Sequence, residues 1–291
     1  MSYLRKHTGF LLFLPALLVI GSLTLYPVVY NLWLSLFNKH AFLPGEKFVG
    51  LRNYEYVLKD PQFWLSFKLG VIYSLATVVL QLILGVGAAL LLHESFPGRN
   101  FFRGAILFPY LVPTIVGVLL WRWLLHDTYG LVNYMLLALG LVKNPIGWFG
   151  QDTIMISLIL VSVWQFFPFV FLTILARLQV IPPELYEAAK VDGASALQRF
   201  IYITLPQLKT VLFVVLLLRG IWMFTKFDTV WLMGGGEGVG LYIRTLPLYA
   251  FMKTFTYWQA GIGATVAILM LLIMAGAAAI YFKIYKIEEG L

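Results

Sequence analysis

Six long apolar runs divide this chain, and they constrain its fold more than any other feature. They lie at about residues 9–37, 66–93, 102–126, 153–177, 206–232 and 258–283. A helix needs roughly 20 apolar residues to cross a bilayer, and each run is at least that long. The runs lack the alternation of barrel strands, and only helices or closed barrels satisfy their backbone in lipid. The sequence therefore predicts an all-α integral membrane protein with six transmembrane helices, forming a single domain over residues 1–291.

Four prolines lie inside these runs, namely Pro27, Pro109, Pro113 and Pro168. A proline within a helix removes one internal hydrogen bond and kinks the chain. Neighbouring helices in a membrane bundle tolerate such kinks. We therefore expect bent helices in the first, third and fourth spans.

The composition argues against a soluble protein and against several kinds of chemistry. Hydrophobic residues make up 61% of the chain and charged residues only 12%, where a soluble domain would carry about a quarter charged residues. The net charge of +8 comes from lysines and arginines that flank the apolar runs, so membrane orientation explains it more simply than nucleic-acid binding. The chain has no cysteine, and its histidines lack metal-ligand spacing, so no metal site is predicted.

An even number of spans places both termini on one side of the membrane. The basic residues of the tails and of the short loop at 93–102 favour a cytoplasmic location for that side. The basic residues of the 38–65 loop disagree, although acidic residues dilute them. The orientation therefore depends mainly on a resemblance given below.

The segment 178–206 is a charged, half-apolar loop between the fourth and fifth runs. Pro182-Pro183 predicts a helix start, because proline costs little in the first turn. On that short helix one face is shared by Leu185, Ala188, Ala189 and Asp192, and the small residues allow a partner to approach closely. Gly193 permits a sharp break before a second short helix. The pattern alone fits either a docking loop or a helix that rests on lipid headgroups.

The spacing within this loop is E-A-A-x₃-G-x₉-I-x-L-P, formed by Glu187-Ala188-Ala189, Gly193, Ile203 and Leu205-Pro206. It resembles the cytoplasmic loop by which ABC importer permeases hold their ATPase subunits. Nearly the whole chain resembles the permeases of binding-protein-dependent sugar importers, the family that includes maltose and glycerol-3-phosphate permeases. The matching stretches are 13–16, 26–27, 48–54, 109–110, 164, 168–169, 176–186, 227–228, 234–236 and 245–249. Met233 and Glu237 depart from the usual residues around the Gly-Gly-Gly run.

The resemblance implies a set of roles and partners. Glu187, with Ala188, Ala189 and Asp192, would insert into a cleft on the ATPase, and Gly193 would provide the bend. The chain would be the first-type subunit of a permease heterodimer in the cytoplasmic (inner) membrane, with both termini cytoplasmic. Its other partners would be two ATPase subunits, which bind ATP and magnesium, and an extracytoplasmic solute-binding protein. No cofactor is expected on this chain, and a sugar-type solute would cross by alternating access.

The fifth run offers a candidate solute path. Arg219, Trp222 and Lys226 fall at i, i+3 and i+7 and would share one helical face. A charged residue near the membrane centre costs about 2.5–3.5 kcal/mol and usually faces a cavity or a partner. The alternative is a charge satisfied by a carbonyl group or by the partner subunit. On a continuous helix Asp228 would lie opposite this row and would be a poor partner for it.

Polar and aromatic residues in other spans are further candidates. Trp164 and Gln165 in the fourth span could join the solute path, or they could serve as belt and packing residues. Trp258 and Gln259 at the start of the sixth run carry the same two interpretations. Gln81, alone in the second span, is expected to bridge helices.

Two kinds of enzyme chemistry are missing from the sequence. No G-x-x-x-x-G-K-[ST] motif occurs, so ATP would have to bind on another chain. No set of nucleophile and base, and no pair of intramembrane carboxylates, indicates catalysis or a proton relay, so no catalytic residue is predicted. The competing hypotheses are an organophosphate importer, a stand-alone secondary carrier and an intramembrane enzyme.

Overall fold

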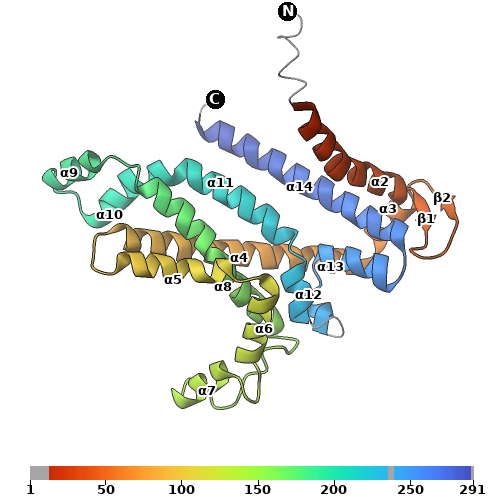
Figure 1. Ribbon diagram of the computed structural model, residues 1–291, viewed down its shortest axis with the longest axis horizontal. Coiled ribbons are helices and arrows are strands. Elements are labelled where there is room, and N and C mark those ends of the chain that lie inside the picture. The colour runs from red at the N-terminus through yellow and green to blue at the C-terminus, as the bar shows by residue number, and fades with distance from the viewer. Residues whose placement is uncertain (1–12, 235–238, 290–291) are drawn as a thin grey trace, which may run out of the picture. The chain divides into compact units, whose positions relative to one another are not determined.

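The computed structural model describes residues 13–234 and 239–289 (Figure 1). Residues 9–12 of the first predicted span, and Gly235, Gly236 and Glu237, lie outside the described residues. The chain forms two compact units, each built from separate stretches of sequence. Unit 1 combines Met1–Leu65 with Leu246–Ala277, and unit 2 combines Ser66–Thr245 with Ala278–Leu291.

Helices dominate the described residues, and five are long and apolar enough to cross a membrane. These are Phe13–Ser35, Pro61–His93 (α4), Ile154–Leu178 (α8), Ala196–Phe224, which contains α11 (Leu205–Phe224), and Ala260–Tyr285 within α14 (Ala260–Glu289). A sixth candidate is the bent pair of α5 (Arg99–Leu111) and α6 (Thr114–Leu124). The predicted all-α membrane fold is confirmed.

The third apolar run, predicted as a bent span at 102–126, forms two helices. Its two halves, α5 and α6, meet at an angle of 98°. The break falls at Val112, whose ψ of 128° is extended, and the next residue is Pro113. A proline disfavours the helical conformation of the residue before it, so Pro113 turns the chain. Pro109 and Pro168 instead lie inside helices.

The fifth run is also broken, which corrects the span predicted at 206–232. The helix α11 ends at Phe224, and a second helix, α12, runs from Asp228 to Gly234. Residues 225–227 between them are not helical. Lys226 and Asp228 therefore do not follow the helical geometry on which the sequence analysis relied.

Unit 1 contains a small antiparallel hairpin that the sequence analysis did not predict. Strand β1 (Phe37–Lys39) pairs with β2 (Glu46–Phe48), so that Phe37 lies opposite Phe48. The other elements of this unit are a π-helical turn Gly21–Leu25, α2 (Tyr26–Ser35), α3 (Arg52–Lys59), α13 (Leu246–Phe251), a second π-helical turn Met252–Thr256, and the first part of α14. Asn53 ties α3 to the hairpin, because its Nδ2 donates to the carbonyl of Phe37 at 2.9 Å.

Unit 2 is a helical bundle whose apolar core lies among α4, α8 and α11. The core includes Ala89, Val170, Phe171, Ile174 and Leu208. Its shorter elements are α7 (Leu131–Ala138), α9 (Pro183–Val191), α10 (Ala196–Arg199), a π-helical turn Phe200–Thr204 and a 3₁₀ turn Val239–Tyr242. Within this unit α9 and α10 lie at one end, and α7 lies far from them (Figure 1).

The close packing of α4 against α8 yields a stability prediction. A Cβ atom added at Gly85 would lie 2.6 Å from the Cβ of Val170, and both atoms are fixed to backbones. The helices would have to separate, and overpacking of this kind costs about 1–3 kcal/mol. We therefore expect Gly85→Ala to lower the thermal unfolding temperature of the purified protein.

Gly87 offers a matched control on the same helix. A Cβ there would meet no atom within 4 Å, and alanine favours helix over glycine by about 1 kcal/mol. Gly87→Ala should therefore leave the unfolding temperature unchanged or raise it. An equal or higher unfolding temperature for Gly85→Ala would contradict the close approach of α4 and α8.

Candidate functional site

The loop between α8 and α11 folds into two short helices. The helix α9 begins at Pro183 and carries Glu184 in its first turn and Lys190 in its last turn. These charges suit the helix dipole at each end. After α9, Gly193 adopts a φ of +79°, a conformation that L side chains rarely accept. The break that the sequence predicted at this glycine is present.

The second helix is fixed by a capping box. The Ser195 side chain accepts a hydrogen bond from the Gln198 N–H at 3.3 Å, and the Ser195 N–H donates to the Gln198 side chain at 2.7 Å. Arg199 also donates to the carbonyl of Ala194 at 2.7 Å. These short-range bonds fix the start of α10 from within its own segment.

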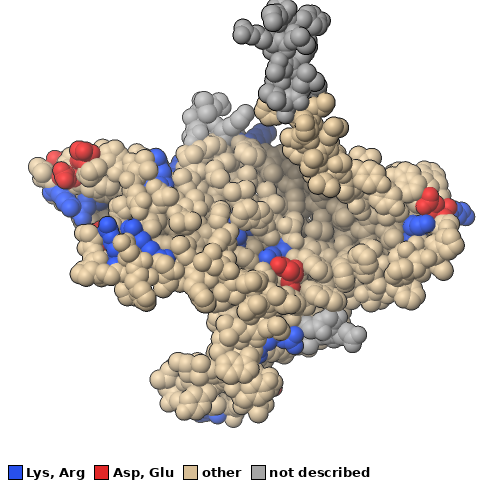
Figure 2. Space-filling view, viewed as in Figure 1, with Lys and Arg blue, Asp and Glu red and all other residues tan. Residues whose placement is uncertain are grey.

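The two helices expose nearly all of their surface. Neither α9 nor α10 contains a buried residue, and Glu187, Ala188 and Asp192 are exposed while Ala189 is half-buried. Large apolar side chains are exposed beside these residues: Leu185 by 43%, Val191 by 87%, Leu197 by 67% and Tyr202 by 76%. Acidic and basic side chains gather at this end of unit 2 (Figure 2). Exposed apolar side chains among charges are typical of an interaction surface.

Hydrogen bonds attach α9 to the start of α11 and join α11 to α8. The hydroxyls of Tyr186 and Thr204 lie 3.0 Å apart, which ties α9 to the base of α11. Arg177 at the end of α8 donates to the carbonyl of Gln207 at 3.0 Å and to its side-chain oxygen at 2.9 Å. A force on α9 would therefore reach both α8 and α11.

A second cluster lies inside unit 2 around Arg219. This side chain is only 2% exposed, and its Nε donates to the Oε1 of Gln81 at 2.9 Å. Gln81 in turn donates to the carbonyl of Ser162 at 3.1 Å, and the Ser162 hydroxyl lies 2.8 Å from that of Tyr73. The network joins α4, α8 and α11, so Gln81 bridges helices as predicted.

Aromatic rings surround the two basic side chains. The Arg219 guanidinium lies 5.1 Å from the ring centre of Phe166 and 5.6 Å from that of Trp222, and the Lys226 ammonium lies 4.4 Å from Phe166. These distances permit cation–π attraction. Trp222 is 41% exposed, so it presents surface while Arg219 lies behind it. The structure brings the three residues predicted from the fifth run together.

Asp228 was expected to be a poor partner for the Arg219 row on an unbroken helix, but the helix is broken and Asp228 pairs with Lys226. The Lys226 ammonium lies 2.9 Å from one carboxylate oxygen of Asp228 and 3.1 Å from the other. The two residues meet because the helix stops at Phe224 and the chain between α11 and α12 is not helical. Arg219 forms no ion pair within residues 13–234 and 239–289, so its positive charge is not neutralised there.

Trp164 and Gln165 lie against α6 instead of the Arg219 cluster. Gln165 is 2% exposed and donates to the carbonyl of Val112 at 3.1 Å. That carbonyl is freed by the break before Pro113, so Gln165 satisfies a backbone group inside the membrane region. The ring of Trp164 packs edge-to-face on Trp121 at 5.7 Å. Both residues therefore support the bend.

Tyr73, Ser162 and Phe166 also belong to the cluster, and the sequence did not predict them as members. The hydroxyls of Tyr73 and Ser162 within apolar runs were the visible sequence signal, because a hydroxyl in a membrane helix usually forms a hydrogen bond with another helix. Nothing in the sequence paired them with Arg219. Within the described parts of the chain, no group of three or more His, Cys, Asp or Glu side chains could hold a metal ion.

Asp60, just outside the span of α4, organises the polar end of unit 1. Tyr249 donates to its carboxylate at 2.6 Å, Gln62 donates through its N–H at 2.9 Å, and the Lys253 ammonium lies 3.3 Å away. Burial acts to raise the pKa of Asp60, but these donors outweigh it and hold the pKa below its ordinary value. The ionised carboxylate therefore stabilises the folded state.

Because the folded pKa of Asp60 is depressed, its stabilisation is complete above the ordinary aspartate pKa of about 3.9 and is lost as the pH falls through the folded pKa. We expect Asp60→Asn to lower the unfolding temperature at pH 7, since a hydrogen bond to a charged group contributes about 1.5–3 kcal/mol. The gap to the wild type should begin to narrow below about pH 3.9 and close as the pH falls through the lower, folded pKa. Glu55→Gln is the control. Glu55 forms an exposed ion pair with Lys59, and such pairs contribute little to stability, so this substitution should barely change the unfolding temperature. A gap that stays constant with pH would contradict the role of the Asp60 charge.

Sequence comparison places these features in a known family. The family profile described as "Binding-protein-dependent transport system inner membrane component" matches residues 81–286, which is more than half of the chain. The chain belongs to this family. It is thus a membrane transport component of the inner membrane.

Two curated relatives and one solved structure extend the comparison. The chain is 38% identical over 290 residues to the trehalose/maltose transport system permease protein MalF of Thermococcus litoralis, covering 99% of this chain and 97% of that protein. It is 35% identical over 282 residues to the sulfoquinovosyl glycerol transport system permease protein SmoG of Agrobacterium fabrum, covering 96% and 90%. A bacterial ABC transporter involved in the import of the acidic polysaccharide alginate shares the fold, with a TM-score of 0.82, 19% identity and coverage of 97% and 98%.

Proposed function

We propose that this chain is the permease subunit of an ATP-driven, binding-protein-dependent importer for a sugar or sugar derivative. Two of its relatives are named for trehalose/maltose and for sulfoquinovosyl glycerol, and each resembles the chain over at least nine-tenths of its length. The solute would cross by alternating access, in which the permease opens first to one side of the membrane and then to the other.

The observation that carries this proposal is the pair of helices α9 and α10, neither of which contains a buried residue. The chain turns between them at Gly193, and the Ser195 capping box fixes the start of α10. Tyr186 of α9 is bonded to Thr204 beside the start of α11, and α11 is bonded to α8 through Gln207 and Arg177. A rigid exposed element of this kind can transmit motion from a partner to the spans. In the proposal Glu187, Ala188, Ala189 and Asp192 contact a cleft on the ATPase, and Gly193 provides the bend.

The proposed solute path runs past Trp222. Its ring is 41% exposed and is backed by the ring of Phe169 at 5.3 Å, as a stacking face for a sugar requires. Arg219 is a positioning residue in this proposal, because it lies behind the Trp222 ring at 5.6 Å and is itself buried. Lys226, held by Asp228, would offer hydrogen-bond donors at the edge of the same face.

The other subunits of the transporter are proposed from the family resemblance. A second permease would complete the membrane part as a heterodimer. Two ATPase subunits would bind ATP and magnesium on the cytoplasmic side, and an extracytoplasmic binding protein would deliver the solute. Both termini, together with α9 and α10, would lie in the cytoplasm, and this chain would carry out no covalent chemistry.

One observation favours a second candidate, the import of glycerol phosphate or another organophosphate. The guanidinium of Arg219 has no carboxylate partner among the described residues, so the region near Trp222 carries a net positive charge from it. An anionic solute would be attracted to this charge.

The test is ATP hydrolysis by the reconstituted complex with its binding protein, against a panel of neutral sugars, acidic sugars and organophosphates. We expect one sugar-type solute to stimulate hydrolysis. Stimulation by an organophosphate alone would select the second candidate, and stimulation by neither class would overturn both assignments.

A further inference from the structure

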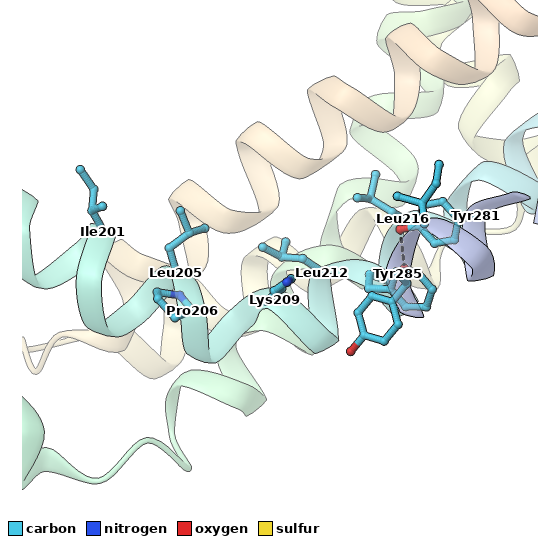
Figure 3. Close-up of a pocket in the computed structure, with 10 residues that line it drawn as sticks. Ile201, Leu205, Pro206, Lys209, Leu212, Leu216, Tyr281 and Tyr285 are labelled. Atoms are coloured by element: carbon cyan, nitrogen blue, oxygen red, sulfur yellow. Dashed lines mark hydrogen bonds between the residues drawn. The ribbon is translucent and has the colours of Figure 1, made fainter. Parts of the chain in front are cut away.

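An apolar groove lies between the start of α11 and the end of α14, both within unit 2. Its volume is about 450 Å³. Leu205, Lys209, Leu212 and Leu216 from α11 line one wall, and Tyr281 and Tyr285 from α14 line the other (Figure 3). Nothing in the proposed transport mechanism uses this groove.

Aromatic stacking fixes the shape of the groove. The ring of Phe213 stacks on Tyr281 at 4.3 Å and on Tyr285 at 3.8 Å. The Tyr281 hydroxyl also donates to the backbone carbonyl of Phe213 at 3.0 Å. The two helices are thus held at a set distance, so the groove is preformed and does not need a ligand to open it.

The groove is about as long as one lipid leaflet is thick, and it has a basic residue near one end only. From Leu205 to Leu216 the helix rises about 16 Å, close to the roughly 15 Å of hydrocarbon in half a bilayer. Lys209 lies one turn from the polar end, where the α9–α10 loop begins, and the other lining residues of α11 are apolar. A lysine near the headgroup level attracts anionic lipid.

We propose that this groove binds one phospholipid with an anionic headgroup, with an acyl chain between α11 and α14 and the phosphate beside Lys209. Placing the lipid in the inner leaflet rests on the proposed function, because that assigns the α9–α10 loop to the cytoplasm. The binding itself needs no particular solute.

Photo-crosslinking in the assembled transporter tests the proposal. A benzophenone amino acid replaces Leu212, and the complex is reconstituted in vesicles of phosphatidylglycerol or of phosphatidylcholine. We expect a lipid adduct that forms about fivefold more in phosphatidylglycerol, the effect of one lysine near an anionic headgroup. Lys209→Gln should abolish this preference, whereas Lys283→Gln should keep it, since Lys283 is exposed on α14 and does not line the groove.

Two outcomes would overturn the proposal. Equal adducts from both lipids would indicate ordinary lipid at a hydrophobic surface. A crosslink to another protein subunit would indicate that a partner covers the groove. Neither result would affect the proposed sugar import, which is measured separately by solute-stimulated ATP hydrolysis.

Discussion

The Gly193→Val substitution is expected to reduce solute-stimulated ATP hydrolysis by the assembled transporter about tenfold. Gly193 has a φ of +79°, and a side chain in the left-handed region costs about 1–2 kcal/mol. No atom lies within 4 Å of a Cβ added there, so the substitution acts on the backbone and not by a clash. A valine would shift the chain toward another conformation and turn α9 away from the geometry that the ATPase cleft requires. A shift of 1.4 kcal/mol corresponds to a factor of ten.

Gly140 provides the matched control for this substitution. Its φ is +67°, a Cβ there would also meet no atom within 4 Å, and it follows α7, outside the proposed docking loop. Gly140→Val should therefore carry a similar backbone strain and leave the coupling of ATP hydrolysis intact. Equal losses in both variants would indicate a general folding defect. Full activity of Gly193→Val would refute the proposed role of this loop.

The features that the sequence predicted well are those set by nearby residues. The break at Gly193 and the start of α9 depend on residues within one or two turns, and the sequence displays them directly. The apolar spans are likewise local, because their composition and length suffice to predict a membrane helix. The all-α membrane fold could therefore be predicted from the sequence alone.

The features that the sequence could not predict depend on distant residues or on a broken helix. Arg219 and Gln81 form a hydrogen bond although they are 138 residues apart in the chain. The pairing of Lys226 with Asp228 was missed because the prediction assumed an unbroken helix, which stops at Phe224. At Val112 the proline signal was visible, but a bend of 98° also needs Gln165 to satisfy the freed carbonyl. That partner comes from another span.

The Arg219–Gln81 bond leads to the second large effect, measured as the free energy of unfolding. We expect Gln81→Leu and Arg219→Leu each to destabilise the protein, because each removes the bond between Arg219 Nε and Gln81 Oε1 and leaves the remaining buried atom without that partner. Interhelical bonds in membrane proteins average about 0.6 kcal/mol and reach about 1.7. Since a guanidinium is the donor here, and bonds to charged groups are the stronger ones, we expect a coupling of about 1.5 kcal/mol. The double variant should therefore lose about 1.5 kcal/mol less than the sum of the two single losses.

The Gln81→Leu/Arg219→Leu double variant also separates a structural role of Arg219 from a role in transport. It removes the buried guanidinium together with its hydrogen-bond partner, the Gln81 side chain. If Arg219 has only a structural role, solute should stimulate ATP hydrolysis by the folded double variant as it does in the wild type. If Arg219 instead positions Trp222, the result should differ. The solute concentration for half-maximal ATP hydrolysis should rise severalfold, while the maximal rate stays the same. Trp222→Phe should raise that concentration in the same direction with little loss of stability, since the Trp222 side chain is 41% exposed and phenylalanine keeps an aromatic ring there. An unchanged half-maximal concentration in the double variant would remove Arg219 from the solute path and leave it as a tie between α4 and α11.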